Sequence, residues 1–263
     1  MADLAARAAN YMYDGHQARA PFSNLPVDLT PKDEAGAYQI QDTHVDLLRK
    51  SGTGAVAGYK IGLSAAVMQN MFGTTRPCMG VILSDRVWPA GHSVRHGDYV
   101  NLSLECEIAV RVSADLSPDN APFTRDSVAG AVAACHPAFE LIDDRNAEYT
   151  TCQASSLIAD NAWNMGVVLG PEVSDWRALD FSATRGTLTV NGAEVGQGVL
   201  TDAMGHPFEA LAWLANLRAE RGLSIERGAL VMTGSIVPPA YVQPGDEAAY
   251  SVENMGEVTA KIV

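Results

Sequence analysis

The chain has 263 residues, of which 47% are hydrophobic and 19% charged, and this composition is typical of a globular protein rather than a disordered or fibrous one. Its 18 basic and 31 acidic residues give a formal net charge of −13 without a basic run, which argues against nucleic acid or a membrane surface as a partner. No apolar run reaches the roughly 18 residues of a membrane span, and charges interrupt the N-terminus where a signal peptide needs an apolar core, so we expect a cytoplasmic protein.

The first part of the chain shows helical patterns. A helix is predicted from about Ala2 to Gln17. A second helix is predicted to start after Thr30, a suitable N-cap followed by Pro31 at the first helical position, and to stop before Gly52. Residues 1–75 are therefore predicted to form a helical N-terminal subdomain.

From Val56 onward, short β-rich runs alternate with glycine and proline, which indicates an extensive sheet. Asn191-Gly192 is the strongest hairpin signal, because a type I′ turn needs positive φ at both central residues. Helical patterns interrupt the strands at about Thr124–Cys135, Thr150–Asp160 and Pro207–Glu220. The pattern predicts an α+β fold, in which residues 76–263 form a mixed β body integrated with the helical subdomain.

Two glutamates share one face of a predicted strand, because alternation over residues 104–112 sends Glu105 and Glu107 to the same side. A third, Glu140, stands alone in an apolar run, where an unpaired carboxylate costs several kcal/mol. If the three converge, they supply the hard oxygen ligands that Mg²⁺ or Mn²⁺ prefers. The residues alone leave a second interpretation open, in which these acids pair with Lys or Arg or face solvent.

Lys60 is the single cation in the strand-like run 56–62. One interpretation is a surface lysine whose stem lies along apolar residues. The other is a buried ammonium that holds a substrate carboxylate or moves a proton, with its pKa lowered towards neutrality by burial. The residues do not decide between the two.

Six segments carry a family resemblance. They are GYKIGLS at 58–64, LECEIAV at 104–110, FELIDDR at 139–145, IADNA at 158–162, MGHPFEALAWLAN at 204–216 and LVMTGSIVPP at 230–239. Together they resemble the 2-keto-4-pentenoate hydratase and 4-oxalocrotonate decarboxylase family of the fumarylacetoacetate hydrolase superfamily. The resemblance runs in order from about Thr30 to Val263.

The resemblance implies a mixed β-roll of the fumarylacetoacetate hydrolase type with flanking helices. It also implies Mg²⁺ or Mn²⁺ held by Glu105, Glu107 and Glu140, with Lys60 as a catalytic residue at the substrate. Enzymes of this family are typically homo-oligomers and act on small 2-oxo acids, so we expect both properties here.

The reactions of this family share an enolate, which a divalent cation stabilises. We expect a hydratase that adds water to a 2-hydroxy-2,4-dienoate, equivalent to a 2-oxo-4-enoic acid, and forms a 4-hydroxy-2-oxo acid. The alternative is a 2-oxo acid decarboxylase or tautomerase of the 4-oxalocrotonate decarboxylase type on the same site. A carbon–carbon hydrolase and a non-catalytic partner subunit are further alternatives.

Two residues depart from the hydratase pattern. Cys78 stands where we expect an aspartate, and Trp163 stands where we expect a small residue such as serine. Both make the site drier, which suits decarboxylation better than water addition. We still favour hydration, because the Thr233-Gly234-Ser235 segment is closer to the hydratases. We expect Cys78, Trp163 and Ser235 to contact the substrate.

Overall fold

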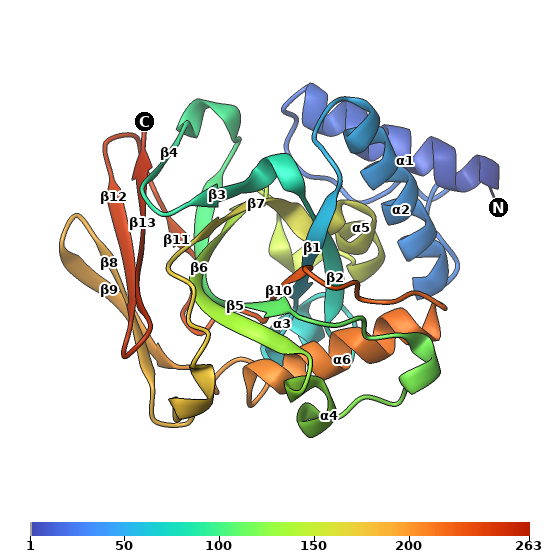
Figure 1. The fold of residues 1–263 in the computed structure, drawn as a ribbon. Coiled ribbons are helices and arrows are strands. Elements are labelled where there is room, and N and C mark those ends of the chain that lie inside the picture. The colour runs from blue at the N-terminus through green and yellow to red at the C-terminus, as the bar shows by residue number, and fades with distance from the viewer. Residues whose placement is uncertain (1) are drawn as a thin grey trace.

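The strands pair into two sheets, and helices pack at one end and along one side of the larger sheet (Figure 1). The computed structural model describes residues 2–263. The strands are β1 (Val56–Gly62), β2 (Cys78–Leu83), β3 (Val87–Pro89), β4 (His92–Val94), β5 (Leu102–Val112), β6 (Val132–Asp143), β7 (Asn164–Leu169), β8 (Arg185–Val190), β9 (Ala193–Val199), β10 (Leu230–Met232), β11 (Ala240–Tyr241), β12 (Glu247–Val252) and β13 (Gly256–Ile262). The helices are α1 (Ala2–Gln17), α2 (Glu34–Lys50), α3 (Ala66–Met71), α4 (Arg125–Ala129), α5 (Ala154–Ala159) and α6 (Pro207–Glu220).

The larger sheet has the order β2-β1-β10-β5-β6-β7-β3, with β11 paired to β5. It is mixed: β1 and β10 run parallel, whereas the long central strands β5 and β6 run antiparallel. The smaller sheet has the order β4-β13-β12-β8-β9 and packs on the larger one, where the ring centroids of Phe139 in β6 and Tyr250 in β12 lie 6.2 Å apart. These features confirm the predicted α+β class and mixed sheet.

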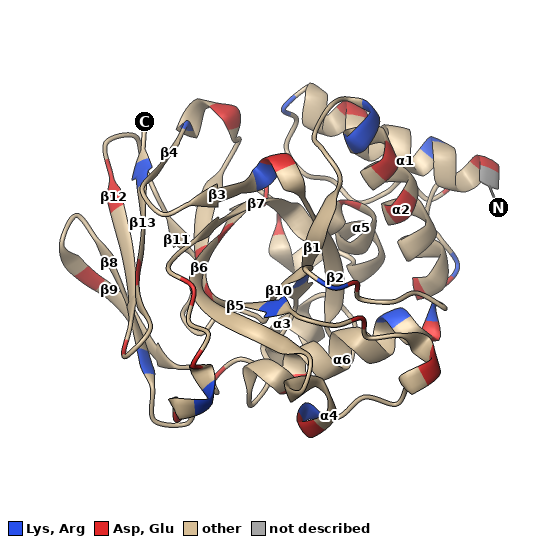
Figure 2. Cartoon of the chain, in the orientation of Figure 1, with Lys and Arg blue, Asp and Glu red and all other residues tan. Residues whose placement is uncertain are grey.

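The charged residues of the described chain are spread over helices, strands and loops, and Figure 2 shows Lys and Arg interspersed with acidic residues rather than gathered on one element. None of the helices described is long and apolar enough to cross a membrane.

Most predicted elements are confirmed, and two need correction. Residues Asn191 and Gly192, with φ of 53° and 76°, connect β8 to β9 as predicted. The N-cap of α2 is Asp33 rather than Thr30, because the Asp33 carboxylate accepts the Gly36 N–H at 2.8 Å. The helix predicted over 124–135 stops at Ala129, because the segment that follows becomes β6 and pairs with β5.

The predicted helical subdomain shares a sheet with the β body. Strand β1 lies within residues 1–75, yet it pairs with β2 and β10. The division of the chain near residue 75 stays a prediction.

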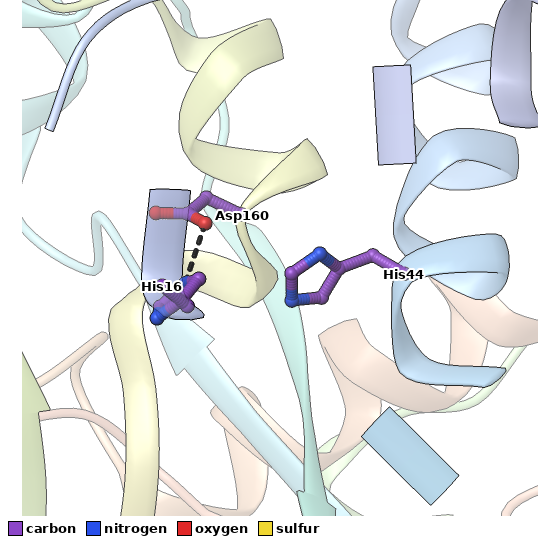
Figure 3. Close-up of side chains that lie close together, drawn as sticks. All are labelled: His16, His44 and Asp160. Carbon is purple, nitrogen blue, oxygen red and sulfur yellow. Dashed lines mark hydrogen bonds and ion pairs between the residues drawn. The ribbon is translucent and has the colours of Figure 1, made fainter. Parts of the chain in front are cut away.

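A cluster of polar side chains brings α1 and α2 together with the segment that follows α5 (Figure 3). Asp160 contacts His16 Nε2 of α1 through Oδ1 at 2.7 Å and accepts from Arg145 through Oδ2 at 2.6 Å. His44 of α2 lies beside this pair, with its ring centroid 5.5 Å from that of His16. Burial acts to raise the pKa of Asp160, but His16 and Arg145 outweigh it and keep that pKa below its usual value.

His44 is 1% exposed, and burial lowers its pKa to about 4, against the opposing effect of Asp160. Between about pH 4 and pH 6.5 the unfolded chain therefore binds a proton at His44 that the folded chain excludes. The favourable contribution of neutral His44 is complete above pH 6.5 and is lost as the pH falls towards 4.

We expect His44→Gln, which cannot titrate, to flatten the acid side of the stability profile. The loss of unfolding free energy from pH 8 to pH 5 should be about 2 kcal/mol smaller in the variant than in the wild type, because the His44 proton no longer contributes. Urea unfolding at both pH values measures this difference. Equal losses in the two proteins would contradict the assignment.

Candidate active site

Three glutamates meet on one face of the central strands, and we call them the glutamate cage: Glu105 and Glu107 of β5 and Glu140 of β6. The antiparallel register places Glu105 directly opposite Glu140, and Glu107 follows two residues along on the same face. One carboxylate oxygen from each lies within 4.8 Å of the others. Glu107 and Glu140 are fully buried, whereas Glu105 is partly exposed. The predicted convergence of the three acids is therefore present.

Each fully buried glutamate has one bonded and one unpartnered oxygen among the described residues. Glu107 Oε2 accepts the Gly234 N–H at 2.7 Å, and Glu107 Oε1 has no partner. Glu140 Oε1 accepts Asn164 Nδ2 at 2.7 Å and lies 3.3 Å from Lys60 Nζ, while Glu140 Oε2 has no partner. Buried oxygens left in this state are unfavourable unless a cation takes them.

When fully ionised, the three carboxylates of the cage carry more negative charge than Lys60 balances. If all three carboxylates ionise, their charge of −3 and the +1 of Lys60 leave −2, which a divalent cation would neutralise. Burial raises the pKa of Glu105 to about 7, although Lys60 opposes it. Burial and the neighbouring carboxylates also raise the pKa of Glu107 well above its usual value. The donor set and its charge therefore fit a hard divalent cation.

Lys60 is 3% exposed, so the interpretation as a surface lysine is wrong. Burial acts to lower the pKa of its ammonium, but Glu140 and Glu105 outweigh burial and raise that pKa above its ordinary value. The expectation that burial lowers the pKa of Lys60 towards neutrality is therefore wrong, because the two glutamate charges outweigh burial. Lys60 is a buried cation beside the cage.

Glycines let neighbouring elements approach Lys60. A Cβ on Gly62 would lie 3.1 Å from Cys78 Sγ and 3.4 Å from Lys60 Nζ, so the thiol and the ammonium face the same small space. A Cβ on Gly80 would lie 2.8 Å from the Asn161 carbonyl oxygen. Only glycine at position 80 therefore allows the turn that contains Asn161 to reach β2.

That turn, Asn161–Trp163, is strained. Its residues Asn161, Ala162 and Trp163 have φ of 55°, 49° and 58°, a region that non-glycine residues rarely occupy. Asn161 clamps the turn to β2, because its side chain accepts the Val81 N–H at 2.7 Å and donates to the Val81 carbonyl at 2.9 Å.

Trp163 lies in an aromatic cluster with Phe22, Phe72 and Tyr149, whose ring centroids are 5.1, 5.9 and 5.5 Å from that of Trp163. These edge-on contacts fix the indole in place. The neighbouring Ala162 Cβ lies 3.7 Å from the position of a Gly62 Cβ, so the turn borders the Lys60 side of the cage.

The other two predicted substrate contacts lie in different surroundings. Cys78 borders the space beside Lys60 and also lines a groove of about 540 Å³ between α3 and α5. Burial raises the pKa of the Cys78 thiol to about 12, so the thiol is neutral. The Ser235 hydroxyl donates to the Val237 carbonyl at 2.8 Å and accepts the Cys106 N–H at 3.1 Å. Substrate contact by Cys78, Trp163 and Ser235 stays a prediction.

The sequence did not point to Asn164 or to the Gly234 N–H, the two neutral donors of the cage. A second set of potential ligands, His16, His44 and Asp160, also offers atoms within 4.8 Å of one another. Both oxygens of Asp160 are already bonded there, and Arg145 neutralises its charge. In this second set the only carboxylate is already paired, whereas the cage has two buried oxygens without a partner among the described residues.

Comparison with known proteins agrees with this geometry. The family described as "Fumarylacetoacetate (FAA) hydrolase C-terminal" matches residues 68–263. The 2-hydroxyhexa-2,4-dienoate hydratase of Comamonas testosteroni is 29% identical over 90% of this chain and 88% of that protein. The 2-oxo-hept-4-ene-1,7-dioate hydratase of Escherichia coli is 30% identical over 94% of this chain and 92% of that protein.

Among solved structures, 4-oxalocrotonate decarboxylase from Pseudomonas putida G7, complexed with magnesium and adipate, is 25% identical and superposes with a TM-score of 0.91. The superposition covers 100% of this chain and 98% of that one, which confirms the predicted β-roll fold. The chain therefore belongs to the fumarylacetoacetate hydrolase superfamily, in the enzyme family of the 2-keto-4-pentenoate hydratases and 4-oxalocrotonate decarboxylase.

Proposed function

We propose that the protein is a metal-dependent hydratase that converts a 2-hydroxy-2,4-dienoate, equivalent to a 2-oxo-4-enoic acid, to a 4-hydroxy-2-oxo acid. The observation that carries the proposal is the glutamate cage, with its two unpartnered buried oxygens beside Lys60. Relatives that match 90% and 94% of the chain are hydratases named for a 2-hydroxy-2,4-dienoate and a 2-oxo-4-ene dioate. We also propose the homo-oligomeric state and cytoplasmic location expected from the sequence.

Glu105, Glu107 and Glu140 would hold Mg²⁺ or Mn²⁺, since these hard cations prefer carboxylate oxygens and keep positions open for water or substrate. The magnesium in the Pseudomonas putida decarboxylase structure supports a divalent cation of this kind. When bound, the cation acts as a Lewis acid on the negative charge that develops on the substrate.

The residues around the cage bind and enclose an anionic substrate. The Lys60 ammonium supplies positive charge where a substrate carboxylate meets the cage, and its contact with Glu140 holds it there. The neutral Cys78 thiol and the turn that carries Trp163 border the same space and limit the water around it. Charge contacts are stronger in such a dry site than in open solvent.

The reaction needs two proton transfers and one water. A proton moves from the 2-hydroxyl to C5 and gives an α,β-unsaturated ketone; water then adds at C4 while C3 gains a proton. Negative charge develops on the C2 oxygen during both steps. Lys60 stabilises this charge if the substrate carboxylate and C2 oxygen lie towards the cage.

Loss of one cage carboxylate should weaken metal binding. We expect Glu105→Gln, Glu107→Gln and Glu140→Gln each to weaken Mg²⁺ binding and abolish turnover while the fold survives, because an amide is a neutral and poorer ligand. Calorimetric titration with Mg²⁺ measures the affinity, and Glu172→Gln, at an exposed glutamate, is the control. Unchanged titrations in all three variants would end the hypothesis of a glutamate metal site.

Loss of the buried ammonium should impair the reaction more than metal binding. We expect Lys60→Ala to lower kcat/KM by about 100-fold or more while Mg²⁺ still binds, because the three carboxylates remain. Lys261→Ala, at an exposed lysine, is the matched control. Wild-type kinetics in the Lys60 variant would exclude a role for this residue in the reaction.

Substrate tests distinguish hydration from decarboxylation. The protein with Mg²⁺ is given 2-hydroxypenta-2,4-dienoate and 4-oxalocrotonate separately, and the dienol absorbance and the release of CO₂ are followed. We expect 4-hydroxy-2-oxopentanoate from the first substrate. Release of CO₂ from the second, with no product from the first, would show a decarboxylase instead.

A further inference from the structure

Asn164 contacts the glutamate cage through Glu140, at the oxygen that is not the unpartnered one. It is the first residue of β7, is 4% exposed, and donates its Nδ2 to Glu140 Oε1 at 2.7 Å. We propose that Asn164 is a positioning residue that fixes the rotation of the Glu140 carboxylate, so that Oε2 is the oxygen presented to the metal. The inference rests on the metal site of the proposed function.

The division of hydrogen bonds on Glu140 supports this role. Glu140 Oε1 accepts a hydrogen bond from the Asn164 amide and forms an ion pair with the Lys60 ammonium, whereas Glu140 Oε2 has no partner among the described residues. Rotation of the carboxylate by half a turn would restore the same contacts, but any intermediate rotation would break the short bond to Asn164. The Asn164 amide therefore fixes the plane of the Glu140 carboxylate and with it the position of the unpartnered oxygen.

Glu107 shows the same arrangement with a different donor. Its Oε2 accepts the Gly234 N–H at 2.7 Å, and its Oε1 is the unpartnered oxygen. Two glutamates from different strands thus each have one oxygen held by a neutral N–H donor and one oxygen free. A repeated division of this kind is expected if both side chains are oriented before the cation arrives.

The residues that precede Asn164 fix its position. The strained turn Asn161–Trp163 ends at Asn164, and Asn161 clamps that turn to Val81 of β2. Asp160, which precedes the turn, is bonded to His16 and Arg145. The backbone of Asn164 is therefore placed by the bonds of Asp160 and Asn161 at the start of this segment and by its own pairing with Ile142 of β6 at the end.

The test is Mn²⁺ binding to the full-length protein, measured from the electron paramagnetic resonance signal of free Mn²⁺. We expect Asn164→Leu and Asn164→Ala to weaken Mn²⁺ binding by about 10- to 100-fold, the usual effect of removing a group that orients a metal ligand. Leucine has the branched shape of asparagine but is somewhat larger, and alanine is smaller, so the two variants guard against a folding defect in either.

Gln41→Leu is the matched control, because Gln41 is another buried amide that donates two hydrogen bonds, to Met79 and Ile158, without touching the cage. We expect this control to lose stability but to bind Mn²⁺ as the wild type does. Affinities within about twofold of the wild type in both Asn164 variants would overturn the role of Asn164 and leave the metal site intact. Absence of Mn²⁺ binding in the wild type would instead overturn the metal site, and this inference with it.

Discussion

The close approach of three carboxylates, two of them fully buried, to the buried Lys60 ammonium is the constraint on which the site depends. Their ligand oxygens lie within 4.8 Å of one another, and at that upper limit two ionised carboxylates repel by about 3.5 kcal/mol at an effective dielectric constant near 20. Lys60 offsets part of this repulsion, because it lies 3.3 Å from Glu140. Burial is the main cause of the raised pKa values of Glu105, Glu107 and Glu140, and the neighbouring carboxylates add to it at Glu105 and Glu107.

The surrounding fold holds the three carboxylates close together, although their charges repel one another. The long β5–β6 pair fixes the spacing of the three acids, and the left-handed turn before β7 brings Asn164 to the cage. A helix far away in the sequence stabilises this turn, because His16 of α1 contacts the carboxylate of Asp160, the residue before the turn. Strain of this kind persists only where neighbouring contacts over-determine the backbone. The N-terminal helices are therefore structural supports of the site as well as a cover for the sheet.

Patterns within short stretches of the sequence predicted the features that depend only on neighbouring residues. Strand alternation was sufficient to place Glu105 and Glu107 on one face, whereas the approach of Glu140 depends on the β5–β6 register, which no local pattern specifies. Only the resemblance to a known family predicted that Glu140 lies beside Glu105 and Glu107. Thr30 and Asp33 are both acceptable N-caps, so the true start of α2 could not be chosen from residue type.

Asn164 was missed for a related reason. Its function depends on a partner 24 residues earlier and on a turn of non-glycine residues with positive φ, and neither leaves a pattern in the sequence. The pKa of Lys60 was also misjudged from the sequence. Burial alone lowers a lysine pKa, and only the positions of Glu140 and Glu105 reveal that their charges reverse the direction.

The charge balance of the site also suggests an effect of having a neutral cysteine at position 78 in place of an aspartate. The thiol faces the same small space as the Lys60 ammonium, at the position where related hydratases are expected to carry an aspartate. A fourth acid there would bring the formal charge of the cage and Lys60 from −2 to −3, and a divalent cation would leave one negative charge uncompensated. With a neutral thiol, the cation-loaded site has no net charge, and Lys60 is shared among fewer acids. We therefore expect an anionic 2-oxo acid to meet no repulsion from a surplus carboxylate at Cys78, although the thiol contributes no base for water addition.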